Sequence, residues 1–337
     1  MSTANMSGKG DIDIRALFSI TTVHKEVITR QQEVVRNIEE FGKVLNSTAI
    51  PDIQIGEHCS DPYNCDFRGY CWKTVPAYSI FNISNLGWKK KMELYHRGIL
   101  EIKDVPDDFP LSDKQRFQVI AEKTGKGIID KKAIQFFMEQ LQYPLFYLDF
   151  ETHGSPVPLY DNARPYEQIP FQYSLHIQRA KGAEPEHREF LGTPPEDPRP
   201  ELIRQLVSEL ENEGSIIVYN QSFEVNKLKK MAGIYPQFAP AIDKIINRIV
   251  DLIVPFRSKS IYLPAMKGSY SIKEVLPALV PKLSYKELNI NEGGMASRGY
   301  DQLFEITDTE ETEKIRKDLL AYCRLDTLGM VEIIGEF

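Results

Sequence analysis

The chain has 337 residues, of which 42% are hydrophobic and 10% aromatic, enough for about two domains and a sizeable core. Its 48 acidic and 41 basic side chains leave a net charge of −7. This charge excludes a strongly basic protein that binds nucleic acid over its whole surface, but it does not exclude a local basic groove. No apolar run reaches the length of a membrane-spanning helix, and the first ten residues lack the apolar core of a signal peptide. We therefore expect a cytoplasmic protein with no membrane partner.

The first expected element is a single amphipathic helix. Apolar side chains recur at helical spacing from Ile20 to Leu45, which places them on one face. The segment around Pro51 interrupts this pattern. Residues 1–55 are therefore expected to form an N-terminal helix region.

Residues 56–142 are expected to form a smaller region of short helices. Three of the four cysteines of the chain fall within its first 17 positions. Helices are expected from about residue 85 to 95, from Ser112 onward, and from 131 to 141.

The pattern changes at residue 143, where short apolar runs begin to alternate with helical ones. Strands are expected at 145–150, 171–178, 187–191 and 216–219, and helices at 201–211, 222–232, 239–248, 271–279 and 309–334. This alternation is typical of an α/β domain. We place a domain boundary near residue 142, so that residues 143–337 form the second domain.

Two carboxylates end the first of these strands, as Asp149-Phe150-Glu151. Because side chains alternate along a strand, both carboxylates leave it on the same face. Paired carboxylates repel each other unless a cation neutralises them, and a hard divalent ion with oxygen ligands suits such a pair. The motif is short, so a chance pair of acids is the alternative.

Two other elements carry groups that could join these acids. Tyr322 and Asp326 lie four residues apart on the last expected helix and share one face. The alternative is an ordinary amphipathic helix with one buried tyrosine and one solvated aspartate. Glu224 falls in the first turn of the helix that follows strand 216–219, where an acid also complements the helix dipole.

In this order the three elements resemble the DnaQ-like exonuclease superfamily, which has a ribonuclease-H-like fold. The matching residues are Asp149-Phe150-Glu151-Thr152, Asn220-Gln221-Ser222-Phe223-Glu224 and Tyr322-Cys323-Arg324-Leu325-Asp326. The resemblance covers about residues 143–337 and implies a mixed sheet flanked by helices, preceded here by the smaller helical cysteine-cluster region. Glu224 departs from the pattern, which normally has aspartate there. Weak or altered activity is therefore one expectation, with Asp251 as a residue that could assist.

The resemblance also implies that phosphodiester bonds are hydrolysed with two Mg²⁺ or Mn²⁺ ions. The ions would be held by four carboxylates, those of Asp149, Glu151, Glu224 and Asp326. Tyr322 would position the attacking water. Contacts to the terminal nucleotide are expected from Thr152, Asn220 and Phe223. The implied partner is single-stranded DNA or RNA.

A second signal is the run Cys59-x5-Cys65-x5-Cys71. Three cysteines in 13 residues indicate a metal site, with buried free thiols as the alternative. The segment resembles the C-terminal cysteine cluster of RecB-like iron–sulfur nucleases, whose fourth cysteine lies far upstream and has no counterpart here. The candidates are an iron–sulfur cluster with an external ligand, a Zn²⁺ site completed by His58 or His24, and a remnant.

From residue 56 onward the chain is similar to the C-terminal part of a bacterial family of uncharacterised proteins that joins such a nuclease to a DnaQ-like domain. Within this region, residues 85–99 resemble a degenerate helix–hairpin–helix element, which contacts nucleic-acid backbone through main-chain amides and lysines. A solvated basic helix is the alternative. Residues 75–140 hold more basic than acidic side chains, and the basic face could extend to Lys123, Lys126, Lys131 and Lys132.

Three functions are compatible with these patterns. The leading hypothesis is a metal-dependent 3′–5′ exonuclease that acts on single-stranded DNA or RNA. The second is a catalytically weakened nucleic-acid-binding or scaffold protein that carries a metal or iron–sulfur cysteine site. The third is a redox or metal sensor centred on the cysteines. Metal binding by the carboxylates separates the first from the second, and visible absorbance of the cysteine site would support the third.

Overall fold

A five-stranded mixed sheet forms the centre of the protein. The computed structural model describes residue 15 and residues 18–210 and 212–337. The strands are β2 (Leu145–His153), β3 (Ile169–Gln178), β4 (Glu186–Leu191), β5 (Ser215–Val218) and β6 (Ile249–Asp251), in the spatial order β4-β3-β2-β5-β6. The β2-β3 and β3-β4 pairs are antiparallel, whereas β2-β5 and β5-β6 are parallel. This arrangement confirms the expected α/β class.

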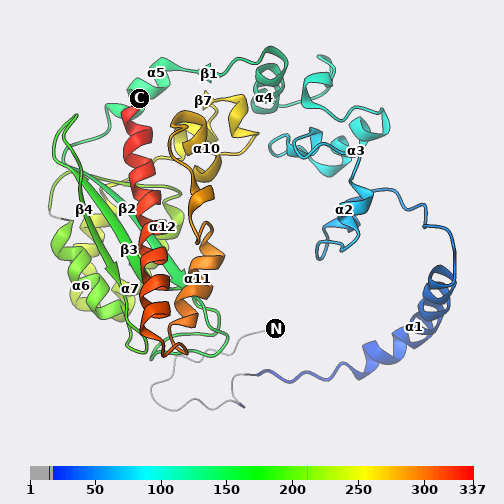
Figure 1. Cartoon of the computed structure of the whole chain (residues 1–337), viewed down its shortest axis with the longest axis horizontal. Coiled ribbons are helices and arrows are strands. Elements are labelled where there is room, and N and C mark those ends of the chain that lie inside the picture. The colour runs from blue at the N-terminus through cyan, green and yellow to red at the C-terminus, as the bar shows by residue number, and fades with distance from the viewer. Residues whose placement is uncertain (1–14, 16–17, 211) are drawn as a thin grey trace.

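Alternating side chains of β2 supply the two cores of the domain. Phe146, Leu148 and Phe150 pack in one core, and Leu145 and Tyr147 in the other. The first core is covered by α6 (Arg199–Glu209), α7 (Ser222–Ile234) and α8 (Ala239–Ile246). The opposite face is covered by α10 (Ile272–Leu279), α11 (Gly293–Gln302) and the long α12 (Thr309–Gly335) (Figure 1). By the same alternation, Asp149 and Glu151 belong to the face that α12 covers.

The register of the sheet brings the acidic end of β2 to the point where β5 ends. Tyr147 is paired with Ile217 in the parallel β2-β5 ladder, so Asp149 lies level with Tyr219, just after β5. A register shift between Glu151 and Thr152 interrupts the β2-β3 ladder at the same place. Such irregularities re-aim side chains at the end of a strand.

The preceding residues form helices and one short strand, and those between residues 80 and 119 share a small core of their own. They are α1 (His24–Leu45), η2 (Glu57–Cys59), α2 (Arg68–Cys71), η3 (Ile80–Asn82), α3 (Trp88–His96), η4 (Ile102–Asp104), α4 (Asp113–Thr124), β1 (Ile128–Ile129) and α5 (Lys131–Met138). The core includes Ile80, Ile83, Leu94 and Phe109. Strand β1 pairs with β7 (Ile261–Tyr262) and so joins residues on either side of position 142.

Most expected elements are present, with some additions. The expected strands and helices are observed within a few residues of their predicted ends. The sequence pattern did not predict α9 (Val254–Arg257), α11, or the short elements η2, α2, η3, η4, β1, β6, β7, η5 (Pro236–Phe238), η6 (Pro264–Met266) and η7 (Tyr285–Glu287). Helix α1 is amphipathic as expected, but in the described chain none of its residues is buried (Figure 1). None of the described helices is both long and apolar enough to cross a membrane.

Candidate metal centre

Three carboxylates converge between the sheet and its longest helix. Asp149 and Glu151 come from β2, and Asp326 comes from α12. One oxygen of each lies within 4.8 Å of the others. Among the described residues, this is the one group of three or more Asp, Glu, His or Cys side chains that meets so closely. We call these three residues the acidic cluster.

The acidic cluster is held where its charges are poorly solvated. Burial raises the pKa of Asp326 to about 6. Burial, with the Asp326 carboxylate beside it, raises the pKa of Glu151 to about 8. The same two causes, in the same order, raise the pKa of Asp149 well above its ordinary value. Near neutral pH the cluster therefore holds protons unless a cation replaces them.

Two side chains that the sequence did not single out moderate this repulsion. The Tyr285 hydroxyl donates a hydrogen bond of 2.7 Å to Asp326 Oδ1, which lowers the pKa of that carboxyl. The half-buried Lys273, in the first turn of α10, lowers the pKa of both Glu151 and Asp326. Nothing in the local sequence marks either residue, because both reach the site only through the packing of their segments against α12.

Tyr322 lies one turn before Asp326 on α12 and is buried. The ring centroids of Tyr322 and Tyr285 lie 6.2 Å apart in an edge-to-face arrangement, and Lys273 Nζ lies 5.3 Å from the Tyr322 centroid. Burial and then the Asp326 carboxylate raise the pKa of its hydroxyl, which therefore stays protonated. The expected placement of Tyr322 and Asp326 on one inward face of the helix is thus observed.

Helix α11 covers the other side of Glu151. A Cβ atom at Gly293, the first residue of the helix, would lie 3.8 Å from Glu151 Oε2. The thiol of Cys323, on α12, lies 3.6 Å from Asp149 Oδ2. The main chain of α11 at Gly293 and the neutral thiol of Cys323 therefore lie close to two of the three acids.

Glu224 lies close to the acidic cluster but outside the group that meets within 4.8 Å. It is almost fully buried in the first turn of α7, and its Oε2 has no hydrogen-bond partner among the described residues. Burial raises its pKa to about 8. Its charge in turn raises the pKa of Asp149 and Glu151, so it acts on the same site.

Asp251 has a structural role in the loop before Glu224. Its Oδ1 accepts hydrogen bonds from the backbone amides of Asn220, at 2.9 Å, and Ile253, at 3.2 Å. Asn220 has a φ of 76°, and the hydrogen bond from its amide stabilises this left-handed conformation. The other oxygen of Asp251, Oδ2, lies 3.9 Å from the Arg257 guanidinium, and the charge of Asp251 contributes to the raised pKa of Glu224. That Asp251 assists Glu224 in catalysis stays a prediction.

The three expected substrate contacts lie around the acids. Thr152 follows the register shift of β2 and is half-buried. Asn220 is exposed at the end of β5, and Phe223 is half-buried on α7 next to Glu224. Asn220 also accepts a hydrogen bond from the Ser222 hydroxyl, at 3.0 Å.

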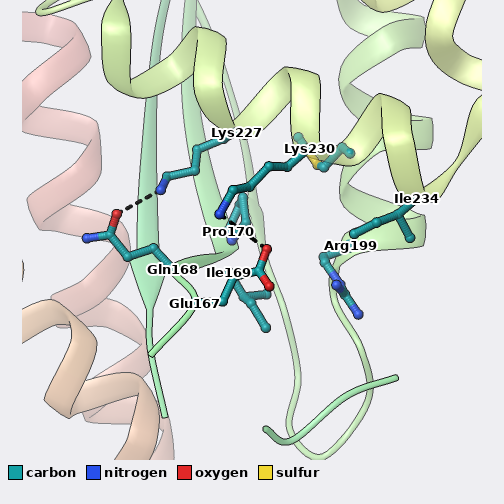
Figure 2. A pocket seen from close by; sticks show the side chains of 9 residues that line it. Glu167, Gln168, Ile169, Pro170, Arg199, Lys227, Lys230 and Ile234 are labelled. Atoms are coloured by element: carbon teal, nitrogen blue, oxygen red, sulfur yellow. Dashed lines mark hydrogen bonds and ion pairs between the residues drawn. The ribbon is translucent and has the colours of Figure 1, made fainter. Parts of the chain in front are cut away.

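A tight pocket lies under the other end of α7. Figure 2 shows Lys227 reaching Gln168, at 2.8 Å, and Lys230 paired with Glu167, at 3.3 Å. Burial lowers the pKa of Lys227 to about 8. The pocket has a volume of about 10 Å³, which is room for a single water. Its polar side chains therefore link α7 to the start of β3, and the pocket leaves no room for a larger ligand.

The three clustered cysteines do not converge as the acids do. None of the four cysteines, all of which the structure describes, forms a disulfide. Cys59 is buried, Cys65 and Cys71 are half-buried, and the Cys65 amide donates to Cys59 O at 3.0 Å. The loop is fastened by Arg68, which donates to Ser60 Oγ at 2.8 Å. A metal at these thiols, and its completion by His58 or His24, both exposed here, stays a prediction.

The segment expected to resemble a helix–hairpin–helix element begins with α3 and a turn at Gly98, whose φ is 75°. The element that follows is only η4, a single 3-10 turn. Of the expected basic face, Lys123 is engaged with Asp107 at 2.6 Å.

Comparison with known proteins found one matching family model and several bacterial relatives. Residues 146–271 match the model of a domain of unknown function, DUF2779, which spans Asp149, Glu151 and Glu224 but ends before α12. The uncharacterised protein UU173 of Ureaplasma parvum is 29% identical over 232 residues, covering 63% of this chain and 33% of that protein. The uncharacterised MG366 homologue of Mycoplasma pneumoniae is 26% identical over 369 residues, which cover 96% of this chain and 54% of that protein. The chain thus spans about half or less of the curated relatives it matches, and no solved structure matches it.

Proposed function

We propose that the protein is a metal-dependent 3′–5′ exonuclease acting on single-stranded DNA or RNA. The observation that carries the proposal is the acidic cluster, in which three carboxylates from two elements meet within 4.8 Å at a poorly solvated site. Such a concentration of negative charge is costly without compensation. A structural role alone gives no reason to assemble it.

The donor set fits hard divalent ions. Asp149, Glu151 and Asp326 offer only carboxylate oxygens, which Mg²⁺ and Mn²⁺ prefer over softer ligands. The orphaned Oε2 of Glu224 supplies a further oxygen beside them. When bound, divalent ions lower the pKa of water and stabilise the oxygen that leaves in phosphodiester hydrolysis.

The residues around the ions have distinct tasks in this proposal. Asp149, Glu151 and Asp326 hold the ions, and Tyr285 fixes the orientation of Asp326 through its hydrogen bond. The protonated Tyr322 hydroxyl orients the attacking water. Lys273, over the Tyr322 ring, supplies a positive charge for the phosphate.

The topology supports the proposal. The resemblance implies a mixed sheet flanked by helices, and the five-stranded sheet in the order β4-β3-β2-β5-β6 is mixed and has helices on both faces. We also propose membership of the bacterial family that joins a RecB-like nuclease to a DnaQ-like domain. Its support is that the matched relatives are bacterial and longer than this chain.

The test is a nuclease assay with 5′-labelled single-stranded DNA and RNA in Mn²⁺ or Mg²⁺. We expect products that shorten from the 3′ end and that are absent with EDTA and in the D149A and D326N variants. Asp318, on the same helix but outside the acidic cluster, provides the matched control D318N, which should retain activity. Absence of cleavage by folded, metal-supplied protein would overturn the proposal and favour the scaffold alternative.

A further inference from the structure

We propose that a polar cleft beside the acidic cluster holds the nucleotides immediately 5′ of the scissile phosphate, through their sugar–phosphate backbone. The inference rests on the proposed function and names the path of its substrate. The cleft has a volume of about 480 Å³, within the range of ligand sites. It is lined by Ser84, Asn85, Tyr219, Asn220, Ile253 and the segment 268–272.

Two segments that line the cleft also lead to the acidic cluster. Tyr219 and Asn220 follow β5 at the level of Asp149, and Asn220 begins the turn that leads to Glu224. On the other wall, Ile272 directly precedes Lys273, whose charge acts on Glu151 and Asp326. A strand whose terminal phosphodiester lies at the acids can therefore continue into the cleft.

The chemistry of the lining suits a sugar–phosphate chain. Among the described residues that line the cleft, none has an acidic or basic side chain, and most carry a hydroxyl or an amide. Hydroxyl, amide and backbone groups of this kind make many of the contacts to phosphate and sugar that fix a nucleic acid in register. A positive charge lies close by, because Lys259 Nζ is 3.4 Å from Ser84 Oγ.

The far wall belongs to the segment of the chain that has a positive charge balance. Ser84 and Asn85 form the turn before α3, which carries three consecutive lysines at 89–91. A strand leaving the acids through the cleft thus passes from the acidic domain to the basic region. This direction is the one that phosphate charge favours.

The walls are held at a fixed spacing before any ligand arrives. The Ser84 amide donates to Gln118 Oε1 at 2.9 Å, and the Ser84 hydroxyl donates to Gly268 O across the cleft. Gly268, with a φ of 76°, in turn donates from its amide to Tyr262 OH at 3.1 Å. On the opposite wall the Tyr219 hydroxyl donates to Tyr270 O at 2.6 Å. Preorganised walls of this kind reduce the entropic cost of binding.

The test compares an oligonucleotide with a small phosphodiester in variants of the cleft lining. Asn85 has a φ of 54°, so N85G removes the side chain while retaining the backbone conformation. S269A is a second variant in another segment of the lining. The exposed N46A, at the end of α1, is the matched control. Binding of a 5′-labelled 12-nucleotide strand is measured by fluorescence anisotropy in EDTA, so that the readout needs no turnover.

We expect Kd for the 12-nucleotide strand to rise about 3- to 10-fold in N85G and in S269A, which is the loss of one hydrogen bond, and to stay unchanged in N46A. Hydrolysis of bis(p-nitrophenyl) phosphate with Mn²⁺, which needs no upstream nucleotides, should be unchanged in both variants. Unchanged oligonucleotide affinity in both folded variants would overturn the cleft assignment even if the enzyme is active. Cleft-dependent binding by a protein that cleaves nothing would instead retain the cleft and refute the exonuclease.

Discussion

Replacement of Asp326 by asparagine should stabilise the metal-free protein and abolish its stabilisation by metal. The substitution removes one charge of the acidic cluster, and the amide oxygen of asparagine can still accept the hydrogen bond from Tyr285. Asp326 is the charge that most raises the pKa of both Asp149 and Glu151. A carboxylate that only closed a hydrogen-bond network would show the opposite behaviour, because its loss would destabilise the protein.

The size of the effect follows from the geometry of the acidic cluster. Two unit charges about 4 Å apart repel each other by about 4 kcal/mol at an effective dielectric constant near 20. Glu151, whose pKa is about 8, is only partly ionised at pH 8, so we expect a net gain of about 1–3 kcal/mol there. A divalent ion at about 1,000 times its Kd stabilises the wild-type protein by about 4.1 kcal/mol, which exceeds this gain.

Thermal unfolding at pH 8, with EDTA and with Mn²⁺, measures both effects. In EDTA, D326N should unfold a few degrees above wild type, and with Mn²⁺ the order should reverse. The control D318N changes an acid of the same helix outside the acidic cluster and should follow wild type in both conditions. A lower unfolding temperature of D326N in EDTA, together with an undiminished response to Mn²⁺, would refute the assignment of a metal site.

Four further expectations concern other parts of the molecule. In EDTA, the free energy of unfolding should fall as pH rises from about 6.5 to 8, because Glu151 and Glu224 have pKa values near 8 when folded and 4.5 when unfolded, so the native state binds more protons in this window; His176 and His187, whose pKa values burial lowers to about 3 and about 4, oppose this trend only below about pH 6.5, and urea unfolding at several pH values checks the sign. Y322F should lower kcat about 10- to 1,000-fold with little change in unfolding temperature, as measured by steady-state hydrolysis, and equal activity would remove the hydroxyl from the reaction. G268A should cost about 2–3 kcal/mol in urea unfolding, since its Cβ would lie 2.5 Å from the backbone oxygen of Asn82 at a φ of 76°, and a neutral result would contradict the close approach. C65S should release the metal found by elemental analysis of wild type, whereas a metal-free wild type would identify the thiols as merely structural.

The elements that local pattern determines were predictable. The apolar run at 145–150 indicated a buried strand, and period two placed Asp149 and Glu151 on one face, as observed. Likewise, the spacing of Tyr322 and Asp326 predicted that both would share the inward face of a helix. The short strand β6 was missed because three residues carry too little periodicity to be recognised.

The contributions of Tyr285, Lys273 and Gly293 could not be predicted. Each lies on a segment whose own sequence is unremarkable, and each reaches the acids because α10, α11 and the loop between them pack against α12 and β2. The polar cleft also depends on tertiary packing. Asn85 and Asn220, which both line it, are 135 positions apart, and the hydrogen bond from Ser84 to Gly268 links two segments of the lining.

The sequence by itself determined which residues are candidates for the proposed chemistry and on which face of its own element each one lies, because both follow from residue type and from the period of a strand or a helix. Only the tertiary structure decided that Asp149, Glu151 and Asp326 meet, and that Glu224 lies beside them with an Oε2 that has no hydrogen-bond partner among the described residues. It also decided that the thiols of Cys59, Cys65 and Cys71 do not meet as closely as the three acids do. Distances between elements depend on packing and register, which long-range contacts set and no local pattern contains.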